Sequence, residues 1–405
     1  MMLRDRTAVA GVGWTEYAKN SGVSTLTLAL RAIGSALDDA GIRHSDVDGV
    51  ACHRVGDSVQ AVLVAQALGI KDLRYHLDMF GGGGTSHQVV AHAAMAVATG
   101  MAETVVCWRA VNARSEFRMG GTGRAAPDAL EFQYQLPYGY ATPPQQYAML
   151  ARAWMHARDA KPEDLGRVAI AQREHARLSP RAMMRTPLDM DAYLASRWIA
   201  EPLRLYDCCL ETDAAVAVVV TSAERARDLA QPPVLIAGAA TGGGHTLFSN
   251  GRADATVSAA AELAPRLYAA AGIGPREVDV AQLYDAFTFL VPLQLEDYGL
   301  VERGETGGFY ADGHASLGGL LPVNTHGGHL SEGYVHGLNH VAEAVTQLRG
   351  AAGARQVAGA EVALTTGQPG YVGGTCSALI LRRDGDPVHS SGQATAPMGN
   401  EGNGA

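Results

Sequence analysis

The sequence predicts an α/β fold built from two similar halves. The segments 40-AGIRHSDVDGVACHR-54 and 271-AGIGPREVDVAQLYDA-286 lie about 231 residues apart. Both carry Ala-Gly-Ile, then Val-Asp at the same distance, then an apolar strand. A helical pattern with apolar residues three to four apart precedes each segment, at 26–40 and 259–270. A strand–helix–strand unit that recurs once indicates a duplication rather than a short repeat array.

The remaining elements follow the same order in both halves. The strands predicted for the first half are 7–13, 103–110 and 214–222, and those for the second half are 232–240, 361–367 and 376–383. A glycine turn followed by a helix occupies 81–100 in the first half and 327–350 in the second. The last strand of each half is a continuous apolar run, which is typical of a sheet covered on both faces. The fold class is therefore α/β with buried sheets.

These elements divide the chain into two domains with an insertion and a tail. The first half spans 1–230 and contains an insertion at 111–210, rich in Arg and Met at 176–190, that we expect to cover the site. The second half spans 231–385. The tail 386–405 is rich in small and polar residues, a composition that predicts disorder.

Composition excludes several classes of function. The net charge of −9 argues against nucleic acid or an anionic membrane as a partner, and no apolar stretch is long enough for membrane insertion. The five cysteines are odd in number and form no CxxC motif, which predicts free thiols in the cytoplasm. Lysine occurs only at Lys19, Lys71 and Lys161, which disfavours Schiff-base chemistry.

The glycine-rich segments 81–84 and 324–340 are the candidate site loops. Neither has the spacing of a phosphate-binding loop with a lysine. The histidines of the second loop lack an HExxH pattern or a cysteine partner set, so we predict no metal site and expect most of them to serve packing or to support the site.

The second loop gives the resemblance. Residues 324–337 match N-x-x-G-G-x-x-x-x-G-H-P-x-G, a signature of the thiolase superfamily, but Tyr334 stands in place of the catalytic histidine. The nucleophile motif C-x-[ST]-G corresponds to 83–86, so Gly83 occupies the cysteine position. In 284-YDAF-287, Tyr284 replaces the Asn or His of the NEAF or HDCF motif. Cys376 follows the C-terminal glycines instead of preceding them.

The resemblance covers nearly the whole chain. It implies the thiolase fold, with two βαβαβαββ halves in a five-layered αβαβα arrangement. Stretches 138–155 and 202–229 resemble the sterol-carrier or lipid-transfer-protein branch, and the tyrosine pair resembles its actinobacterial steroid side-chain-cleaving aldolases. For an aldolase of this group, the resemblance implies a homodimer that binds a DUF35-type partner (zinc ribbon plus OB-fold) and so forms a heterotetramer. It implies no cofactor, with CoA as part of the substrate and zinc only in the partner.

The substitutions favour a retro-aldol reaction over thiolase chemistry. Gly83 cannot hold an acyl group, whereas a β-hydroxyacyl thioester needs only a base, an acid and donors for its enolate oxygen. The resemblance implies a 17-hydroxy steroid 20-carboxyl-CoA thioester, cleaved to a 17-ketosteroid and propionyl-CoA. Gly83 would also leave room for a branched substituent.

We assign Tyr284 as the base and Tyr334 as the acid or enolate donor, and the reverse assignment stays open. A tyrosine base would need its pKa lowered by about two units, roughly 3 kcal/mol. The supporting or oxyanion candidates lie on or beside the glycine loops: Asn324, His329, Ser331, Asp285, Gly83 and Gly333. His245 is a candidate for substrate binding.

Two other functions compete with the aldolase. The chain could be a non-catalytic lipid or acyl-CoA carrier that lost the thiolase residues. It could also be a Claisen thiolase that uses another cysteine, such as Cys376.

Overall fold

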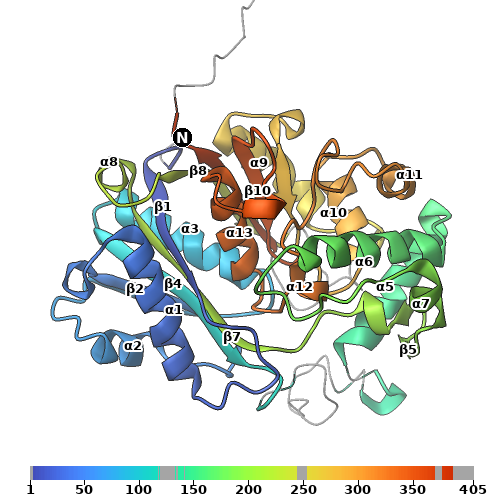
Figure 1. The fold of residues 1–405 in the computed structure, drawn as a ribbon, viewed down its shortest axis with the longest axis horizontal. Coiled ribbons are helices and arrows are strands. Elements are labelled where there is room, and N and C mark those ends of the chain that lie inside the picture. Colours follow the sequence, from blue (N-terminus) through green and yellow to red (C-terminus); the bar gives the residue numbers. More distant parts are fainter. Residues whose placement is uncertain are drawn as a thin grey trace, which may run out of the picture.

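A nine-stranded mixed sheet runs through the protein (Figure 1). The computed structural model describes residues 3–116, 118, 133, 136–140, 142–243, 253–369 and 376–385. In spatial order the strands are β3 (Tyr75–Phe80), β2 (Gly49–Arg54), β4 (Thr104–Asn112), β7 (Asp213–Ser222), β1 (Thr7–Trp14), β8 (Val234–Gly242), β11 (Cys376–Arg383), β10 (Val362–Thr366) and β9 (Val280–Gln282).

The strand order displays the duplication. Strands β1 and β8 pair antiparallel at the centre, and outward from them β7, β4 and β2 mirror β11, β10 and β9 with the same pairing directions. The first half follows the predicted order βαβαβαββ. In the second half, the counterpart of β3 within the described residues is an isolated parallel bridge between Ala281 and Val323. The site loop begins at the next residue.

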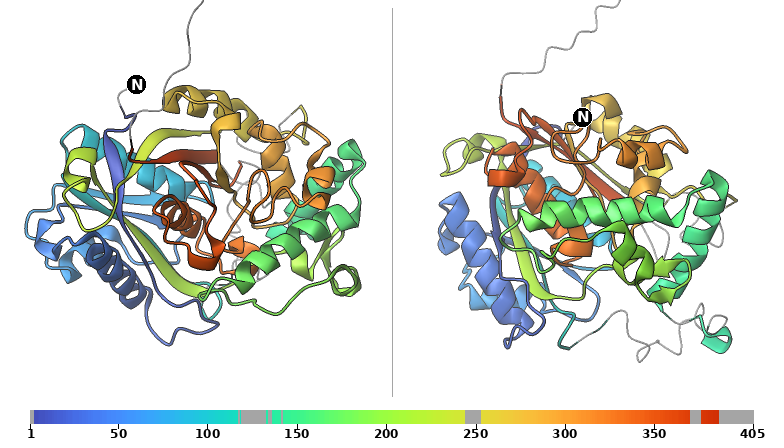
Figure 2. Two further views of the ribbon diagram at one scale, coloured as in Figure 1. Left: turned by 45° about the horizontal axis from the view of Figure 1, so that its top comes forward. Right: turned by 45° about the vertical axis from the view of Figure 1, so that its right-hand side comes forward.

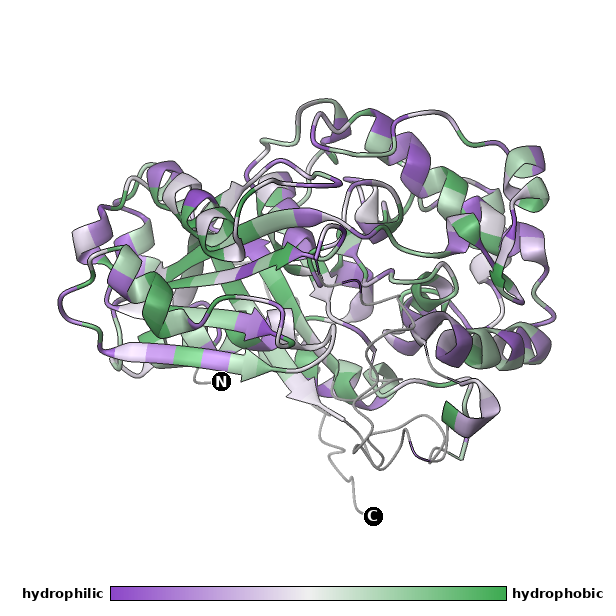
Figure 3. Ribbon diagram, turned by 90° about the horizontal axis from the view of Figure 1, so that it is seen from below, coloured by the Kyte–Doolittle hydropathy of each residue, from purple (hydrophilic) through white to green (hydrophobic). Residues whose placement is uncertain are grey.

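The strands of the two halves form two layers whose inner faces share one core, and helices between and outside them complete the five predicted layers. Helices α1 (Thr25–Ala40), α2 (Ala61–Ala67) and α8 (Ala223–Ala226) cover the outer face of the first half, and α9 (Ala260–Ala271) and α10 (Leu290–Asp297) cover that of the second. Helices α3 (Thr85–Ala98) and α13 (Leu338–Leu348) lie between the halves. The strands are mostly hydrophobic (Figure 3) because alternate residues point to opposite faces: Val216 and Val218 enter the middle core, while Ala217 and Val219 enter the outer one.

The repeated sequence segments have a structural cause. Gly41 and Gly272, the glycines of the two Ala-Gly-Ile motifs, have φ of 70° and 73° and end α1 and α9 in the left-handed region. The aspartates of the two Val-Asp motifs lie just before β2 and β9, and each accepts a backbone N–H group where the neighbouring parallel strand begins. Asp48 accepts from Thr104 at 2.9 Å, and Asp279 accepts from Val362 at 2.9 Å.

The insertion forms a helical unit on one side of the sheet (green in Figures 1 and 2). It contains α5 (Pro143–Arg158), α6 (Pro162–Arg177), α7 (Met190–Ala195) and the short strands β5 (Trp198–Ala200) and β6 (Leu203–Arg204). Helix α6 packs on α11 (Thr306–Ala311) and on α12 (Gly328–Ser331), the start of the site loop. The predicted disorder of 386–405 falls outside the described residues. No helix in the described part of the chain is long and apolar enough to cross a membrane.

The packing of β1 on α1 gives a stability prediction. A Cβ at Gly13 would overlap the carbonyl oxygen of Ala32 and the amide nitrogen of Ala36, so Gly13→Ala should lower the free energy of unfolding by about 1–3 kcal/mol. Gly34 lies on α1 itself with open space at its Cβ, so Gly34→Ala should leave stability unchanged or raise it by about 0.5–1 kcal/mol. Chemical unfolding of both variants measures the difference. Equal stability would contradict the close β1–α1 packing.

Candidate active site

The hydroxyl oxygens of Tyr284 and Tyr334 lie 2.6 Å apart in a hydrogen bond. Tyr284 follows β9, and Tyr334 follows α12 on the glycine-rich loop. Their side chains are buried, with residue exposures of 3% and 9%. The structure therefore brings together the two tyrosines that the sequence singled out, although they are 50 residues apart in the chain.

Hydroxyl and amide side chains hold the backbone of each tyrosine on both sides. Thr212, which precedes β7, accepts from the Tyr334 N–H at 3.1 Å and donates to its carbonyl at 2.8 Å. Thr366 of β10 accepts from the Tyr284 N–H at 3.0 Å and donates to Gln294 at 2.6 Å, which in turn donates to the Tyr284 carbonyl. Both halves of the chain thus fix the hydroxyl pair, and sequence motifs gave no signal for these partners.

Gly83 touches the Tyr284 hydroxyl. A Cβ built at Gly83 would overlap the hydroxyl oxygen and the ring carbon that carries it. The expectation that Gly83 leaves room for a branched substrate group is therefore wrong in this structure, because Tyr284 fills that space. The missing side chain instead permits the tyrosine pair.

Burial keeps both tyrosines neutral. It raises the pKa of Tyr284 well above 10, and the neighbouring Tyr334 raises it further. Burial also raises the pKa of Tyr334 well above 10, although the Tyr284 hydrogen bond and the charge of Arg109 act in the opposite direction. The expectation that a tyrosine base has a lowered pKa is wrong here, because removing a phenolate from water outweighs nearby donors.

Asp285 joins the second-half loops below the tyrosines. Its carboxylate accepts from the backbone N–H groups of His329 at 3.0 Å and Leu330 at 3.3 Å. Burial opposes ionisation, but His329 and His340 outweigh it and lower the pKa of Asp285. The ring of His329 contacts both tyrosine rings, with centroids 5.0 Å from Tyr284 and 4.7 Å from Tyr334. Asp285 and His329 thus lie at the site, as the sequence predicted for supporting residues, and their roles stay predictions.

Three other supporting candidates hold the loop in shape. Both polar atoms of the Asn324 side chain bind the backbone of Leu283, at 2.6 and 2.9 Å. Ser331 accepts from Arg173 of α6 at 3.0 Å. A Cβ at Gly333 would overlap the ring of Tyr17. These contacts show how the three residues hold the loop, and their supporting or oxyanion role stays a prediction.

The remaining candidates lie elsewhere. His245 falls outside the described residues. Cys376 is buried in β11, where its Sγ donates to the carbonyl of Gly242 at 3.1 Å, and it belongs to the apolar core that contains α9. Burial raises the pKa of the other buried thiols, Cys52 and Cys107. No disulfide joins any of the five cysteines.

Sequence analysis missed a buried ion pair behind Tyr334. Arg109 of β4 lies 2.5 Å from Asp57 and donates to His336 at 3.3 Å. The ring of His336 packs 4.6 Å from that of Tyr334 and 4.9 Å from that of His53. An arginine in the middle of a largely apolar strand, 104-TVVCWRAVN-112, was the available signal.

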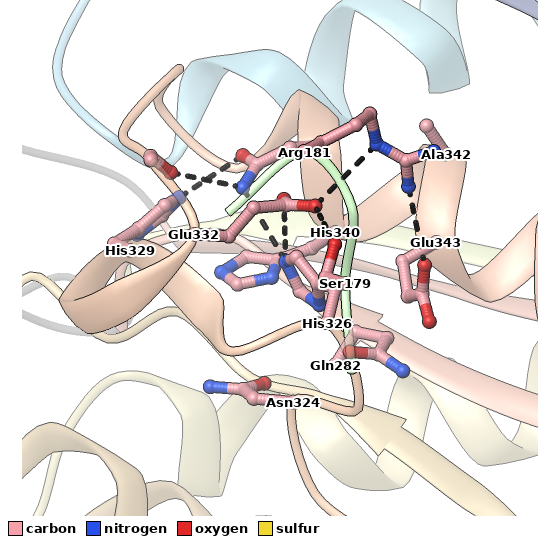
Figure 4. Close-up of polar contacts among 12 residues, drawn as sticks. Ser179, Arg181, Gln282, Asn324, His326, His329, Glu332, His340, Ala342 and Glu343 are labelled. Carbon is pink, nitrogen blue, oxygen red and sulfur yellow. Dashed lines mark hydrogen bonds and ion pairs between the residues drawn. The ribbon is translucent and has the colours of Figure 1, made fainter. Parts of the chain in front are cut away.

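A second missed network joins the insertion to the loop (Figure 4). Arg181 lies between the buried carboxylates of Glu332, at 3.5 Å, and Glu343, at 3.7 Å. Burial raises the pKa of Glu332 to about 7, with Arg181 opposing it and Glu343 adding to it. The backbone N–H of Met183 donates to the Glu332 carbonyl at 3.0 Å. The insertion therefore closes on the residues that immediately precede Tyr334.

Comparisons with known proteins agree with this geometry. A family model described as "Thiolase C-terminal domain-like" matches residues 242–383. The chain is 46% identical to a steroid side-chain-cleaving aldolase of Thermomonospora curvata over 353 residues, which cover 85% of this chain and 90% of that protein. It is 45% identical to the 17-hydroxy-3-oxo-4-pregnene-20-carboxyl-CoA lyase of Mycobacterium tuberculosis over 390 residues, covering 94% of this chain and 100% of the lyase.

Two solved structures are similar to this chain. The structure of an Ltp2–ChsH2(DUF35) aldolase matches with a TM-score of 0.89 and 43% identity, and the match covers 95% of this chain and 99% of that one. Human mitochondrial 3-ketoacyl-CoA thiolase shares the fold, with a TM-score of 0.70 at 16% identity over 95% of this chain and 100% of the human one. The chain therefore belongs to the thiolase superfamily and, within it, to the family of the steroid side-chain-cleaving aldolases.

Proposed function

We propose that this carbon–carbon lyase cleaves a 17-hydroxy steroid 20-carboxyl-CoA thioester into a 17-ketosteroid and propionyl-CoA during sterol degradation. The name of the Mycobacterium tuberculosis relative supports the substrate class. The observation that carries the proposal is the hydrogen bond between the Tyr284 and Tyr334 hydroxyls, at the positions where thiolases hold acyl-transfer residues.

The hydroxyl pair suits the proton movement of a retro-aldol cleavage. The C17 hydroxyl loses its proton, the C17–C20 bond breaks, and its electron pair becomes the thioester enolate. C20 then gains a proton, so the net change is one proton moved from the C17 oxygen to C20. Two neutral phenols in contact can relay it: one accepts the substrate proton while passing its own to the other, which donates to the enolate. No free phenolate has to form, which agrees with the raised pKa of both tyrosines.

We keep Tyr284 as the residue that accepts the substrate proton and Tyr334 as the donor to the enolate. The carbonyl of the thioester supplies the electron sink, and no cofactor takes part in the proposal. Thiolase chemistry through Cys376 is disfavoured, since its thiol is buried against Gly242 in another core. A non-catalytic carrier gives no reason for two tyrosine hydroxyls held together by both halves.

We propose an assembly of a homodimer with a DUF35-type partner, forming a heterotetramer in which zinc belongs to the partner. The partner rests on the Ltp2–ChsH2(DUF35) structure. The dimer is supported by β3, an edge strand with unpaired backbone groups that ends in Phe80, 74% exposed. Leu63 of the adjacent α2 is also exposed. None of the five cysteines forms a disulfide, which supports a reducing, cytoplasmic setting.

Removing either hydroxyl tests the relay. Tyr284→Phe and Tyr334→Phe should each lower the turnover of the steroid thioester by about 10²–10⁴-fold, because the relay then has no second proton carrier. Steady-state kinetics of the chain with its DUF35-type partner measures the turnover. Tyr268→Phe is the control, because Tyr268 lies on α9 and its hydroxyl donates to the Tyr298 carbonyl, not to the tyrosine pair. Turnover close to wild type in either site variant would exclude the relay.

Restoring a side chain at position 83 tests the packing of the pair. Gly83→Ala and Gly83→Cys should reduce aldolase turnover by at least about tenfold by displacing the Tyr284 hydroxyl, and Gly83→Cys should gain no acyl transfer. Gly82→Ala is the matched control, since a Cβ there meets open space. An active Gly83→Ala enzyme would show that Tyr284 does not need its observed position.

The edge strand gives a prediction about assembly. Phe80→Asp should shift the chain from dimer toward monomer at micromolar concentration, because a desolvated charge at an apolar interface is costly. Light scattering after gel filtration measures the mass. Leu320→Asp, at a residue 75% exposed away from β3, should leave the dimer intact. A Phe80→Asp protein that stays fully dimeric places the interface elsewhere.

A further inference from the structure

A hydrogen bond from Arg109 sets the position of the proton on the ring of His336. The guanidinium Nε of Arg109 donates to His336 Nδ1 at 3.3 Å. Because a guanidinium can only donate, Nδ1 accepts and carries no hydrogen. Burial, the charge of Arg109 and the neighbouring His53 lower the pKa of His336 well below 6.5, so the ring is neutral. A neutral imidazole has one hydrogen, which therefore lies on the other nitrogen, Nε2.

The Nε2–H of His336 is a buried donor that lacks an acceptor. The side chain is fully buried, and Nε2 has no hydrogen-bond partner among the described residues. The ring of His53 lies 4.9 Å away at an angle of 83°, but an N–H directed at an aromatic ring is a weak substitute for an N–H bonded to oxygen. A buried N–H without an acceptor destabilises a folded protein, so this one needs an explanation.

The chain turns tightly at His336, next to the tyrosine pair. The ring centroid of His336 is 4.6 Å from that of Tyr334. His336 has a φ of 52°, in the left-handed region, and Gly337 follows with a φ of 89°. A Cβ built at Gly337 would lie 3.6 Å from the ring of Tyr284, so the turn touches both tyrosines. Left-handed backbone is unfavourable for a residue with a side chain and is concentrated at functional sites.

A buried ion pair fixes the His336 ring. Arg109 pairs with Asp57 at 2.5 Å, and their side chains are 0% and 2% exposed. Arg109 also donates to the carbonyl of His53 at 3.2 Å. A fully buried ion pair seldom adds stability, because taking both charges out of water offsets their attraction. The pair instead orients the guanidinium, whose Nε occupies His336 Nδ1 and leaves Nε2–H for another acceptor.

We infer that His336 donates its Nε2 hydrogen to the thioester carbonyl oxygen of the substrate, and so stabilises the enolate that forms when the C17–C20 bond breaks. The inference rests on the proposed function and adds a donor to it. The tyrosine relay leaves this oxygen without one, because Tyr284 serves the C17 hydroxyl and Tyr334 protonates C20. The carbonyl carbon is bonded to C20, so a donor beside Tyr334 suits its oxygen. Arg109 and Asp57 are then positioning residues that act through the ring.

The fixed geometry of the ring is what makes such a donor effective. An N–H that is already oriented in a buried site needs no rearrangement as negative charge grows on the oxygen. The hydrogen bond that Nδ1 accepts from the cationic Arg109 polarises the ring and strengthens the N–H at Nε2. Because His336 gives a hydrogen bond and keeps its proton, the proton transfers remain with the tyrosines.

Nuclear magnetic resonance of the full chain with ¹⁵N-labelled histidine rings tests the donor directly. We expect the ring of His336 to be neutral, with its hydrogen on Nε2, on both sides of the ordinary histidine pKa of about 6.5. The signal should be absent from His336→Asn. Propionyl-CoA at a saturating concentration supplies a thioester oxygen, so the Nε2–H resonance should move downfield when it binds. A hydrogen on Nδ1, or a resonance unmoved by bound propionyl-CoA, would overturn the inference whatever the tyrosine variants show.

Kinetics of the chain with its DUF35-type partner test the catalytic effect. His336→Asn removes the Nε2 donor but keeps a residue type that tolerates left-handed backbone. It should lower kcat by about 10²–10³-fold with little change in KM, as for the loss of one enolate donor. His336→Gln offers an amide NH₂ in place of Nε2–H and should recover at least about tenfold of that loss. His156→Asn, at an exposed histidine of α5, is the control and should leave kcat unchanged. Melting temperatures confirm that the variants fold.

The outcomes separate the donor role from packing and from the relay. If His336 only packs, the glutamine variant will be no more active than the asparagine variant, and the donor role is excluded. A kcat of wild-type size in His336→Asn, beside inactive Tyr284→Phe and Tyr334→Phe variants, would also exclude the donor while leaving the relay standing. Full activity in the tyrosine variants would instead remove the relay on which the inference rests.

Discussion

The structure of the site depends on the contact between Gly83 and the Tyr284 hydroxyl. In the thiolase nucleophile motif the residue at this position is a cysteine, but here even a Cβ atom at residue 83 would overlap the Tyr284 hydroxyl. Because nothing projects from residue 83, the Tyr284 hydroxyl reaches Tyr334 at 2.6 Å. The absence of a side chain at residue 83 therefore both removes the nucleophile of a thiolase and makes room for the Tyr284 hydroxyl.

Burial then sets the kind of acid–base chemistry that the pair can perform. A buried phenol resists ionisation, so a mechanism that starts from a free tyrosinate would have to overcome the raised pKa of both residues. A relay between two neutral phenols avoids that cost, since each accepts one proton as it gives up another. The Asp285 carboxylate accepts the backbone N–H groups of His329 and Leu330, and so fixes the His329 ring that contacts both tyrosine rings.

The two halves and the insertion share the task of holding the pair. Thr212 belongs to the first half and clamps the Tyr334 backbone, while Thr366 and Gln294 clamp Tyr284 from the second. Arg181 and Met183 bring the insertion against Glu332, two residues before Tyr334. The aromatic side chains of Tyr147 and Trp154 pack in the same apolar cluster as both tyrosines. Because both halves and the insertion hold the two tyrosines, a shift of one hydroxyl would disturb contacts that also hold the other.

The sequence by itself determined the duplicated α/β fold and the two tyrosines, because local rules govern both. The glycines that end α1 and α9 and the aspartates that precede β2 and β9 recur at the same spacing in both halves. Sequence motifs identify Tyr284 and Tyr334 without knowledge of where they lie in space. Only the tertiary structure decided that Tyr284 fills the space beside Gly83, that burial raises the pKa of both phenols, and that Asn324 and Ser331 bind Leu283 and Arg173. Those outcomes depend on burial and on partners such as Arg109 and Thr212, which lie far away in the chain and follow no local pattern.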